Sequence, residues 1–471
     1  MGRLQIFHRK KDSMDGRMDM IRGPLLGKIL RFAFPIIMGS VLQQLFSAVD
    51  IAVVGMAGDS GGQAAIGANT SLIALFVNFF VGLAVGINVV IGNYIGQGHK
   101  RRISDTVHTA VLFAALSGVV LCVFVEGIGQ TMLRILGTPE NVLSQAVCYL
   151  RIYALGMPFI LLYNFGASVL RTVGDTKRPL YALMISGAVN MLLDILLVVC
   201  FGMGVAGVAA ATAFSNVVSA VLVLLFLGRE EGDIRLSLTK LKISFPDLLR
   251  LLRIGLPAGL QTMVFSVANL CIQSAINSYG ADAVAGNAIA LIFEVLAYYV
   301  VTGFDQAAVT FTSQNYGAGE LGRCRRVLLL TMASAVCATV AVNGVFIIGK
   351  QFFAGLFTAD GQVMQYVFLR FRYVLVLQFM ICSYEVCGSV LRGLSYSLLP
   401  AVITIFGTCV LRIVWVNTVC EKVRDIKWVF IVYPVSWAVT GIAVTAACVI
   451  VFRKLSRKAQ AGDGAQIAPD R

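Results

Sequence analysis

Two acidic residues lie inside stretches of this chain that otherwise consist of apolar residues. In GAVNMLLDILLVV (187–199), Asn190 and Asp194 are four residues apart, a spacing that places both on one face of a helix. Asp50 lies in a second such stretch, SAVDIAVVG, and Thr212 supplies a hydroxyl within AAATAFSN. A charged side chain at the centre of a membrane helix costs about 2.5–3.5 kcal/mol, so acids retained there indicate a function.

Carboxylate, amide and hydroxyl oxygens are hard ligands of the kind that Na⁺ prefers. If the two carboxyls lie close together in a low-dielectric site, they could instead hold a proton, because two like charges there are unfavourable. We therefore predict an ion-coupling site, with Na⁺ as the hypothetical metal ion and Na⁺ or H⁺ as the coupling ion. It consists of Asp50, Asn190, Asp194 and Thr212.

The composition indicates the setting of these residues. Of 471 residues, 58% are hydrophobic and 13% are charged, whereas soluble proteins carry about 25% charged residues. Apolar runs of about 20 residues indicate an all-α polytopic membrane protein, and their continuity disfavours a β-barrel. The net charge of +14 comes from basic clusters between these runs. It is explained by the excess of Lys and Arg in cytoplasmic loops, so we expect no nucleic-acid partner.

Twelve runs are long enough to cross a membrane. They cover residues 29–56, 64–95, 106–129, 141–171, 179–201, 204–228, 248–279, 283–314, 326–349, 361–391, 399–420 and 427–452. The basic clusters alternate between loops as expected when both termini are cytoplasmic. We predict a cytoplasmic N-terminal tail (1–28), an N-lobe (29–228), a linker (229–247), a C-lobe (248–452) and a C-terminal tail (453–471).

The two predicted lobes are copies of one unit. GASVLRTVGDTKRPL (166–180) recurs as GSVLRGLSYSLLP (388–400). One constant offset, 221, separates the residue numbers of five pairs: Arg171 and Arg392, Pro179 and Pro400, Arg151 and Arg372, Gly96 and Gly317, Gly98 and Gly319. Each copy has six spans, so both enter the membrane from the same side. We expect pseudo-two-fold symmetry about the membrane normal, with a cleft between the lobes for alternating access.

The repeat also tests the acidic site. At this constant offset, Asp194 corresponds to Trp415 and Asn190 to Leu411, while Asp50 falls at Cys271 or Ile272. Acids needed only for packing would be expected in both copies, so their restriction to the first favours a dedicated site.

Other polar residues within spans are weaker candidates. For a substrate cleft we predict Gln43, Asn164, Gln261, Glu294 and Glu385. Acids in a cleft would attract cations; alternatively, Glu294 and Glu385 pair with Arg370 or Arg372, and Asp305 serves helix packing. Pro35 and Pro257 occupy equivalent positions in the first span of each copy, where the missing hydrogen bond permits a hinge.

Patterns typical of enzymes are present but lack their context. FGMGVAG contains GxGxxG without a surrounding βαβ unit and is better explained as a tight turn. GVFIIGKQ resembles a phosphate-binding loop, but Gln351 replaces the required Ser or Thr. No catalytic residue set is evident, so we predict a transporter without a cofactor and without its own ATP hydrolysis.

Nearly the whole chain, about residues 25–455, resembles bacterial MATE (multidrug and toxic compound extrusion) transporters. The resemblance rests on the segment from Pro35 through Val49 and Asp50 to Gly55, and on IGNYIGQG, YNFGASVLRTVGDTKRP, NMLLD and GVAGVAAATAFSN. It implies an antiporter of the bacterial inner membrane that exports cationic amphipathic compounds in exchange for Na⁺ or H⁺. It also implies an N-lobe ion site at Asp50, Asn190, Asp194 and Thr212, and a bend at Pro35.

Two other functions remain as alternatives. A lipid-linked oligosaccharide flippase of the same superfamily would be expected to have more spans and a more basic cavity. An intramembrane enzyme would need a catalytic group near the membrane interface. The partners we expect for the antiporter are small cationic molecules and the lipid bilayer, with the protein acting as a monomer.

Overall fold

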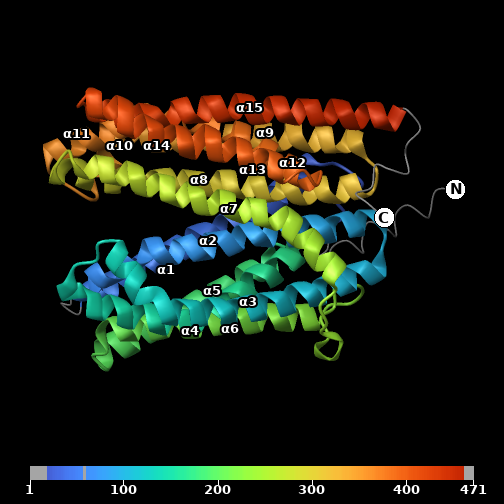
Figure 1. The fold of residues 1–471 in the computed structure, drawn as a ribbon, viewed down its shortest axis with the longest axis horizontal. Coiled ribbons are helices and arrows are strands. Elements are labelled where there is room, and N and C mark those ends of the chain that lie inside the picture. The colour runs from blue at the N-terminus through green and yellow to red at the C-terminus, as the bar shows by residue number, and fades with distance from the viewer. Residues whose placement is uncertain (1–17, 57–59, 461–471) are drawn as a thin grey trace. The chain divides into compact units, whose positions relative to one another are not determined.

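The computed structural model describes residues 18–56 and 60–460, which contain helices and no strand (Figure 1). Twelve helical segments in this part of the chain are long and apolar enough to cross a membrane. Each overlaps one of the twelve predicted spans, so the prediction of an all-α, twelve-span membrane protein is confirmed. Helices suit this setting because they satisfy the hydrogen bonds of their own backbone in lipid.

The helices of the first copy are α1 (Leu26–Met56), α2 (Ser60–Gln97), α3 (Lys100–Ile135), α4 (Glu140–Thr172), α5 (Lys177–Asp194) and α6 (Gly204–Gly228). Those of the second copy are α7 (Phe245–Asn277), α8 (Ala281–Gly317), α9 (Leu321–Ile348), α10 (Lys350–Gly355), α11 (Gly361–Arg370), α12 (Ile381–Gly393), α13 (Leu398–Thr404), α14 (Leu411–Trp415) and α15 (Ile426–Gln460).

The helix boundaries repeat with the offset seen in the sequence. The first residues of α3, α4 and α5 correspond at this constant offset to the first residues of α9, α11 and α13, respectively. In two spans of the second copy the α-helix is interrupted by a π-helical segment, so that α11 and α12 together form one span and α13 and α14 another. The duplication is therefore present in the arrangement of helices as well as in the residues.

Short π-helical segments widen several spans. In the described part of the chain they are η2 (Ile195–Cys200), η4 (Phe371–Leu375), η6 (Ile405–Val410) and η7 (Val416–Cys420). Such segments are rare and often accompany functional sites. Segment η2 begins directly after Asp194, and its first residue corresponds to that of η7 at the offset of the repeat. The two copies thus share this irregularity as well.

The chain divides into two compact units, and two of the three boundaries between them lie inside helices. The first unit contains 38–255 and the described residues up to Arg22; the second contains 23–37 and the described residues from Leu256 onward. The start of α1 therefore belongs with the second half of the chain, and the start of α7 with the first. This differs from the predicted lobes, which were divided at the linker 229–247. The two boundaries inside helices each fall within three residues of a helix proline, Pro35 or Pro257.

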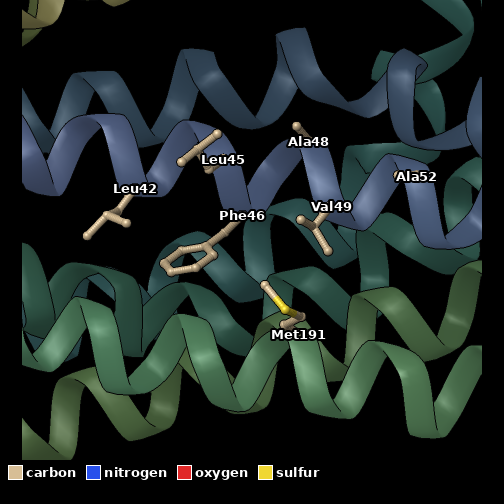
Figure 2. A pocket seen from close by; sticks show the side chains of 7 residues that line it. All are labelled: Leu42, Leu45, Phe46, Ala48, Val49, Ala52 and Met191. Carbon is tan, nitrogen blue, oxygen red and sulfur yellow. The ribbon is translucent and has the colours of Figure 1, made fainter.

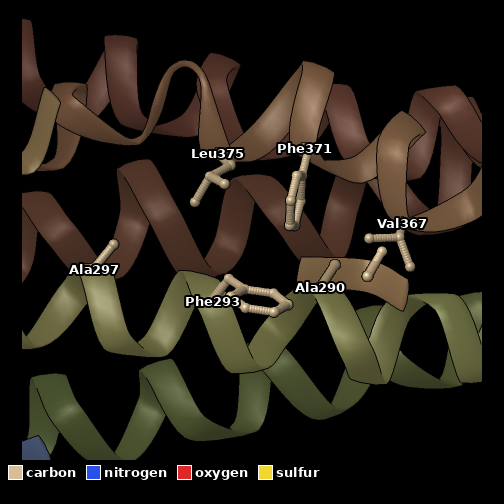
Figure 3. Close-up of a cluster of buried hydrophobic side chains, with 7 residues drawn as sticks. Ala290, Phe293, Ala297, Val367, Phe371 and Leu375 are labelled. Carbon is tan, nitrogen blue, oxygen red and sulfur yellow. The ribbon is translucent and has the colours of Figure 1, made fainter. Parts of the chain in front are cut away.

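Each unit has its own apolar core. In the first unit α4 packs against α2, α3 and α6, and Gly118 of α3 lies directly against Pro158 of α4. In the second unit Phe293 of α8 packs against Phe371 of η4, with ring centroids 5.6 Å apart at 85°. Figure 3 shows these rings pointing toward each other among Ala290, Ala297, Val367 and Leu375.

The GxGxxG pattern forms a turn, as predicted. Gly202 and Gly204 have φ values of +64° and +53°, a region that favours glycine. They connect η2 to α6 and thereby set the position of Thr212 relative to Asp194.

Candidate ion-coupling site

Three helices of the first unit bring the four predicted ion-coupling residues together. Asp50 lies on α1, Asn190 and Asp194 on α5, and Thr212 on α6. The hydroxyl oxygen of Thr212 is 3.4 Å from Oδ2 of Asp50 and 2.9 Å from the carbonyl oxygen of Val208. A hydroxyl has one hydrogen, and the shorter contact directs it to Val208. The contact with Asp50 is the longer of two donations open to this hydroxyl, and the lone pairs of Thr212 stay available to a cation.

Burial sets the chemistry of this cluster. Asp194 is 0% exposed, Asn190 is 5% and Asp50 is 9%. Asp50 interacts electrostatically with Asp194, Thr212 and Asn190. Within the described residues, Oδ1 of Asp50, both carboxyl oxygens of Asp194 and Nδ2 of Asn190 have no hydrogen-bond partner. Burying unpaired acceptors is costly, so the arrangement favours a proton or a cation at these oxygens.

Two tyrosines next to the acids were not anticipated from the sequence. Tyr149 and Tyr153 of α4 stack with ring centroids 5.9 Å apart. Both interact electrostatically with Asp50, and Tyr149 also interacts with Asp194. Their i, i+4 spacing in CYLRIYALG is a usable signal, because it places two polar hydroxyls on one face of an apolar helix.

An apolar groove runs between α1 and α5, next to the acids in sequence. Its larger part has a volume of about 580 Å³ and is lined by Leu42, Leu45, Phe46, Ala48, Val49, Ala52 and Met191. Figure 2 shows Phe46 and Val49 of α1 and Met191 of α5 around this space. A further part of about 360 Å³ adds Met184, Ala188 and Leu192. Because Val49 precedes Asp50 and Met191 follows Asn190, the same helix segments carry both the groove and the acids.

In the second unit, Glu294 belongs to a buried ion pair. Its carboxylate accepts two hydrogen bonds from Arg370, at 2.6 and 2.8 Å. Arg370 also donates to Asn287, and Gln378 donates to the carbonyl oxygen of Glu294 at 2.8 Å. The charge of Glu294 is thus compensated within the protein. This matches the alternative that Glu294 pairs with an arginine instead of attracting a cationic substrate.

Three of the remaining cleft candidates have a hydrogen-bond partner. Glu385 accepts a hydrogen bond from Tyr298 at 3.2 Å, Gln261 accepts one from Arg392 at 3.0 Å, and Asn164 donates to the carbonyl oxygen of Ile160 within its own helix. Asp305 accepts from Ser389, and Gln43 is exposed. Arg392, the donor to Gln261, also interacts electrostatically with Glu385 and Asp305. Gln261 and Glu385 of the second unit therefore lie around one arginine, whereas Asn164 belongs to the first unit.

Comparison with known proteins identifies the family of this chain. The MatE family model matches the chain twice, at residues 35–196 and 257–417. Together the two matches cover more than half of the chain. The chain belongs to the MatE family of multidrug efflux transporters. One match falls in each copy, in agreement with the internal duplication, and the resemblance to MATE transporters is confirmed.

Relatives and solved structures of MATE proteins match over most of the chain. It is 27% identical to the probable multidrug resistance protein YoeA of Bacillus subtilis, over 90% of this chain and 93% of the relative. It is 26% identical to the probable multidrug resistance protein NorM of Thermotoga maritima, over 82% and 84%. A solved outward-facing MATE transporter of the MOP superfamily superposes with a TM-score of 0.85 at 22% identity, covering 93% of this chain and 98% of that one.

Within this MATE protein, both span prolines are accommodated without a break. Helix α1 continues through Pro35 and α7 through Pro257. Because proline removes one hydrogen bond of the helix, each is a local point of lower bending stiffness. In α1 this point lies fifteen residues before Asp50.

Proposed function

We propose that this MATE protein is a secondary antiporter that exports cationic amphipathic compounds in exchange for Na⁺ or H⁺. One observation supports the coupling site above all others. Two buried carboxyls, Asp50 and Asp194, lie beside each other on α1 and α5, and three of their four oxygens have no hydrogen-bond partner in the described residues. Such a pair takes up a cation or a proton readily and releases it when exposed to water.

The same helices link ion binding to the groove. A cation at Asp50 and Asp194 draws α1 and α5 together, because both acids contact it. Val49 and Met191, the neighbours of Asp50 and Asn190, line the apolar groove, so this movement alters the groove and lowers its affinity for an apolar ligand. Pro35 is the proposed hinge of α1, and Pro257 its counterpart in α7. Inward movement of one charge supplies about 2.3 kcal/mol per 100 mV.

The expected substrates combine an apolar body with a positive charge. The apolar side chains of the groove, including two methionines and a phenylalanine, repack around ligands of different shape. The unpaired carboxyls next to it favour a cation. Both features suit lipophilic cationic dyes such as ethidium.

Efflux from proteoliposomes tests the proposal. Reconstituted protein is loaded with ethidium and exposed separately to an inward Na⁺ gradient and an inward proton gradient. We expect one or both to drive efflux, and Asp50→Asn and Asp194→Asn each to abolish it while insertion is unchanged. Normal gradient-driven efflux by either variant would contradict the assignment of the coupling site.

We also propose that the protein resides in a bacterial inner membrane as a monomer with both termini cytoplasmic. The alternation of basic loops supports this orientation. Accessibility of single cysteines to an impermeant reagent, introduced at Lys177 and at Thr138 in a cysteine-free background, tests it. Labelling of intact cells at position 138 and not at 177 is expected, and the reverse pattern would contradict the orientation.

A further inference from the structure

Arg412 is a cation buried inside a membrane span of the second unit. It lies on α14 between the π-helical segments η6 and η7 and is 1% exposed. Its Nε donates to Ser436 at 3.0 Å, and Nη1 donates to Asn269 at 3.3 Å. Its Nη2 is buried and has no acceptor in the part of the chain that the structure describes.

The charge of Arg412 is not balanced by its surroundings. It interacts electrostatically with Arg370, whose own charge is paired with Glu294. No carboxylate of residues 18–56 or 60–460 lies within ion-pair distance of Arg412. A guanidinium stays charged in proteins, so this cluster holds two cations and one anion. An isolated buried charge is strongly unfavourable without a partner of opposite sign.

Aromatic rings compensate only part of this charge. The guanidinium carbon of Arg412 lies 4.5 Å from the ring centroid of Tyr433 and 5.3 Å from that of Phe265. Ring faces attract a cation, but they accept no hydrogen bond from the N–H groups in the plane of the guanidinium. The hydrogens of Nη2 therefore still require an acceptor.

Two further buried donors near Arg412 have no partner in the described residues. They are the hydroxyl of Tyr384 on α12 and the indole N–H of Trp437 on α15. Tyr384 interacts electrostatically with Arg412. The ring of Trp437 lies 5.9 Å from that of Tyr433, which packs on Arg412. Arg412, Tyr384, Tyr433 and Trp437 are called the Arg412 cluster below.

The Arg412 cluster lies on spans that correspond, in the repeat, to spans of the acidic site of the first unit. At the constant offset between the copies, Arg412 corresponds to Met191 and Tyr433 to Thr212. Arg370, which interacts with Arg412, corresponds to Tyr149. The π-helical segments η2 and η7 also correspond. On these corresponding spans, one copy therefore carries buried carboxyl groups, and the other carries buried guanidinium and N–H groups.

We propose that the Arg412 cluster binds a small monovalent anion, a halide or a carboxylate group. The anion accepts a hydrogen bond from Nη2 of Arg412 and a second from the hydroxyl of Tyr384, and it neutralises the excess charge. The acidic site of the first unit and this site then have opposite polarity and lie on corresponding spans of the repeat.

Thermal unfolding of the full-length protein in detergent tests this site. The Tm is measured in sodium gluconate, whose anion is large, and after replacement by sodium chloride or sodium formate at constant ionic strength. We expect a saturable rise in Tm of about 2–4 °C with chloride, formate or both. A rise with chloride alone identifies a halide site, and a rise with formate alone identifies a carboxylate site.

Variants separate binding from a general effect of salt. Arg412→Met should lose the rise, whereas Arg412→Lys, which keeps the charge, should retain it at higher anion concentration. The matched control is Arg372→Met at an exposed arginine, which should respond as the wild type does. Equal Tm values of the wild type in all three salts, or an unchanged rise in Arg412→Met, would overturn the proposal.

Anion binding can also be measured directly in the wild-type protein, which tests the site even if Arg412→Met does not fold. Crystals of the wild-type protein soaked in bromide should show an anomalous peak beside Nη2 of Arg412. The absence of bromide there, together with chloride-independent stability, would also overturn the site.

Discussion

The hydroxyl of Thr212 on α6 lies 3.4 Å from the carboxyl of Asp50 on α1 and bonds the carbonyl oxygen of Val208 on its own helix. It thus places a hydroxyl group beside a carboxyl whose other oxygen has no hydrogen-bond partner among the described residues. This contact joins two residues that are 162 positions apart in the sequence. It makes Thr212 a ligand to whatever occupies the acidic pair, and not only a helix-packing residue.

Thr212→Ala should therefore weaken coupling without abolishing it. Loss of one neutral ligand, worth about 1 kcal/mol, corresponds to a roughly five-fold increase in the ion concentration that gives half-maximal efflux. Thr212→Ser should restore the wild-type value. Thr331→Ala is the matched control, because the hydroxyl of Thr331 is buried and bonds only its own helix. An unchanged ion dependence in Thr212→Ala would exclude Thr212 as a ligand.

Substitution of the two stacked tyrosines, Tyr149 and Tyr153, should change the ion dependence of efflux to different extents. Tyr149 interacts electrostatically with both acids, Asp50 and Asp194, whereas Tyr153 interacts with Asp50. We expect Tyr149→Phe to change the half-maximal ion concentration about two- to five-fold and Tyr153→Phe to change it less. The measurement is ion-dependent dye efflux at equal amounts of reconstituted protein. The opposite order would show that Tyr153, and not Tyr149, is the more important neighbour of the site.

The effects of substituting Glu294 and Arg370 on the free energy of unfolding should not be additive. Glu294→Leu leaves the guanidinium buried without its partner and should cost about 3–5 kcal/mol in the free energy of unfolding. Adding Arg370→Met removes the stranded charge and should recover most of this loss. Denaturant unfolding of both single variants and the double variant measures the coupling. Simple addition of the two losses would contradict the pairing seen at 2.6 and 2.8 Å.

The groove can be narrowed at one glycine. A methyl group at Gly187 of α5 would overlap the ring of Phe46 on α1, so Gly187→Ala should displace this ring and cost about 1–3 kcal/mol in stability. Efflux of large dyes should fall more than efflux of small ones. At Gly127 of α3 no atom lies within 4 Å of the added methyl, so Gly127→Ala is the control and should be neutral or slightly stabilising. Equal efflux of all dyes by Gly187→Ala would exclude the groove as the substrate path.

Much of the fold follows from the sequence because membrane spans have simple rules. Length and apolarity predicted all twelve spans, and the constant offset between matching residues predicted the duplication that the helix boundaries repeat. Asp50 and Asp194 were assigned to one site because an acid in lipid needs a partner or a ligand, but the sequence could not show that they meet.

Other features depend on tertiary packing and could not be predicted. The pairing of Glu294 with Arg370 was only one of two alternatives, since the sequence does not show which helix faces meet. Tyr149 and Tyr153 were overlooked because an isolated tyrosine in a span is usually a packing residue. The π-helical segments arise where neighbouring helices impose an extra residue in a turn, and local sequence carries little signal for that.

The assignment of the start of α1 to the second unit has a consequence for biosynthesis. Phe32 packs edge-to-face against Phe311 of α8, with ring centroids 5.6 Å apart, and Gly303 of α8 lies against Ala33 and Ile37. Phe311 is translated long after Phe32, and at roughly 5–20 residues per second the delay is about 15–60 s. The first helix to emerge from the ribosome therefore waits for partners made in the second half of translation, and a nascent chain that stops at residue 247 lacks them.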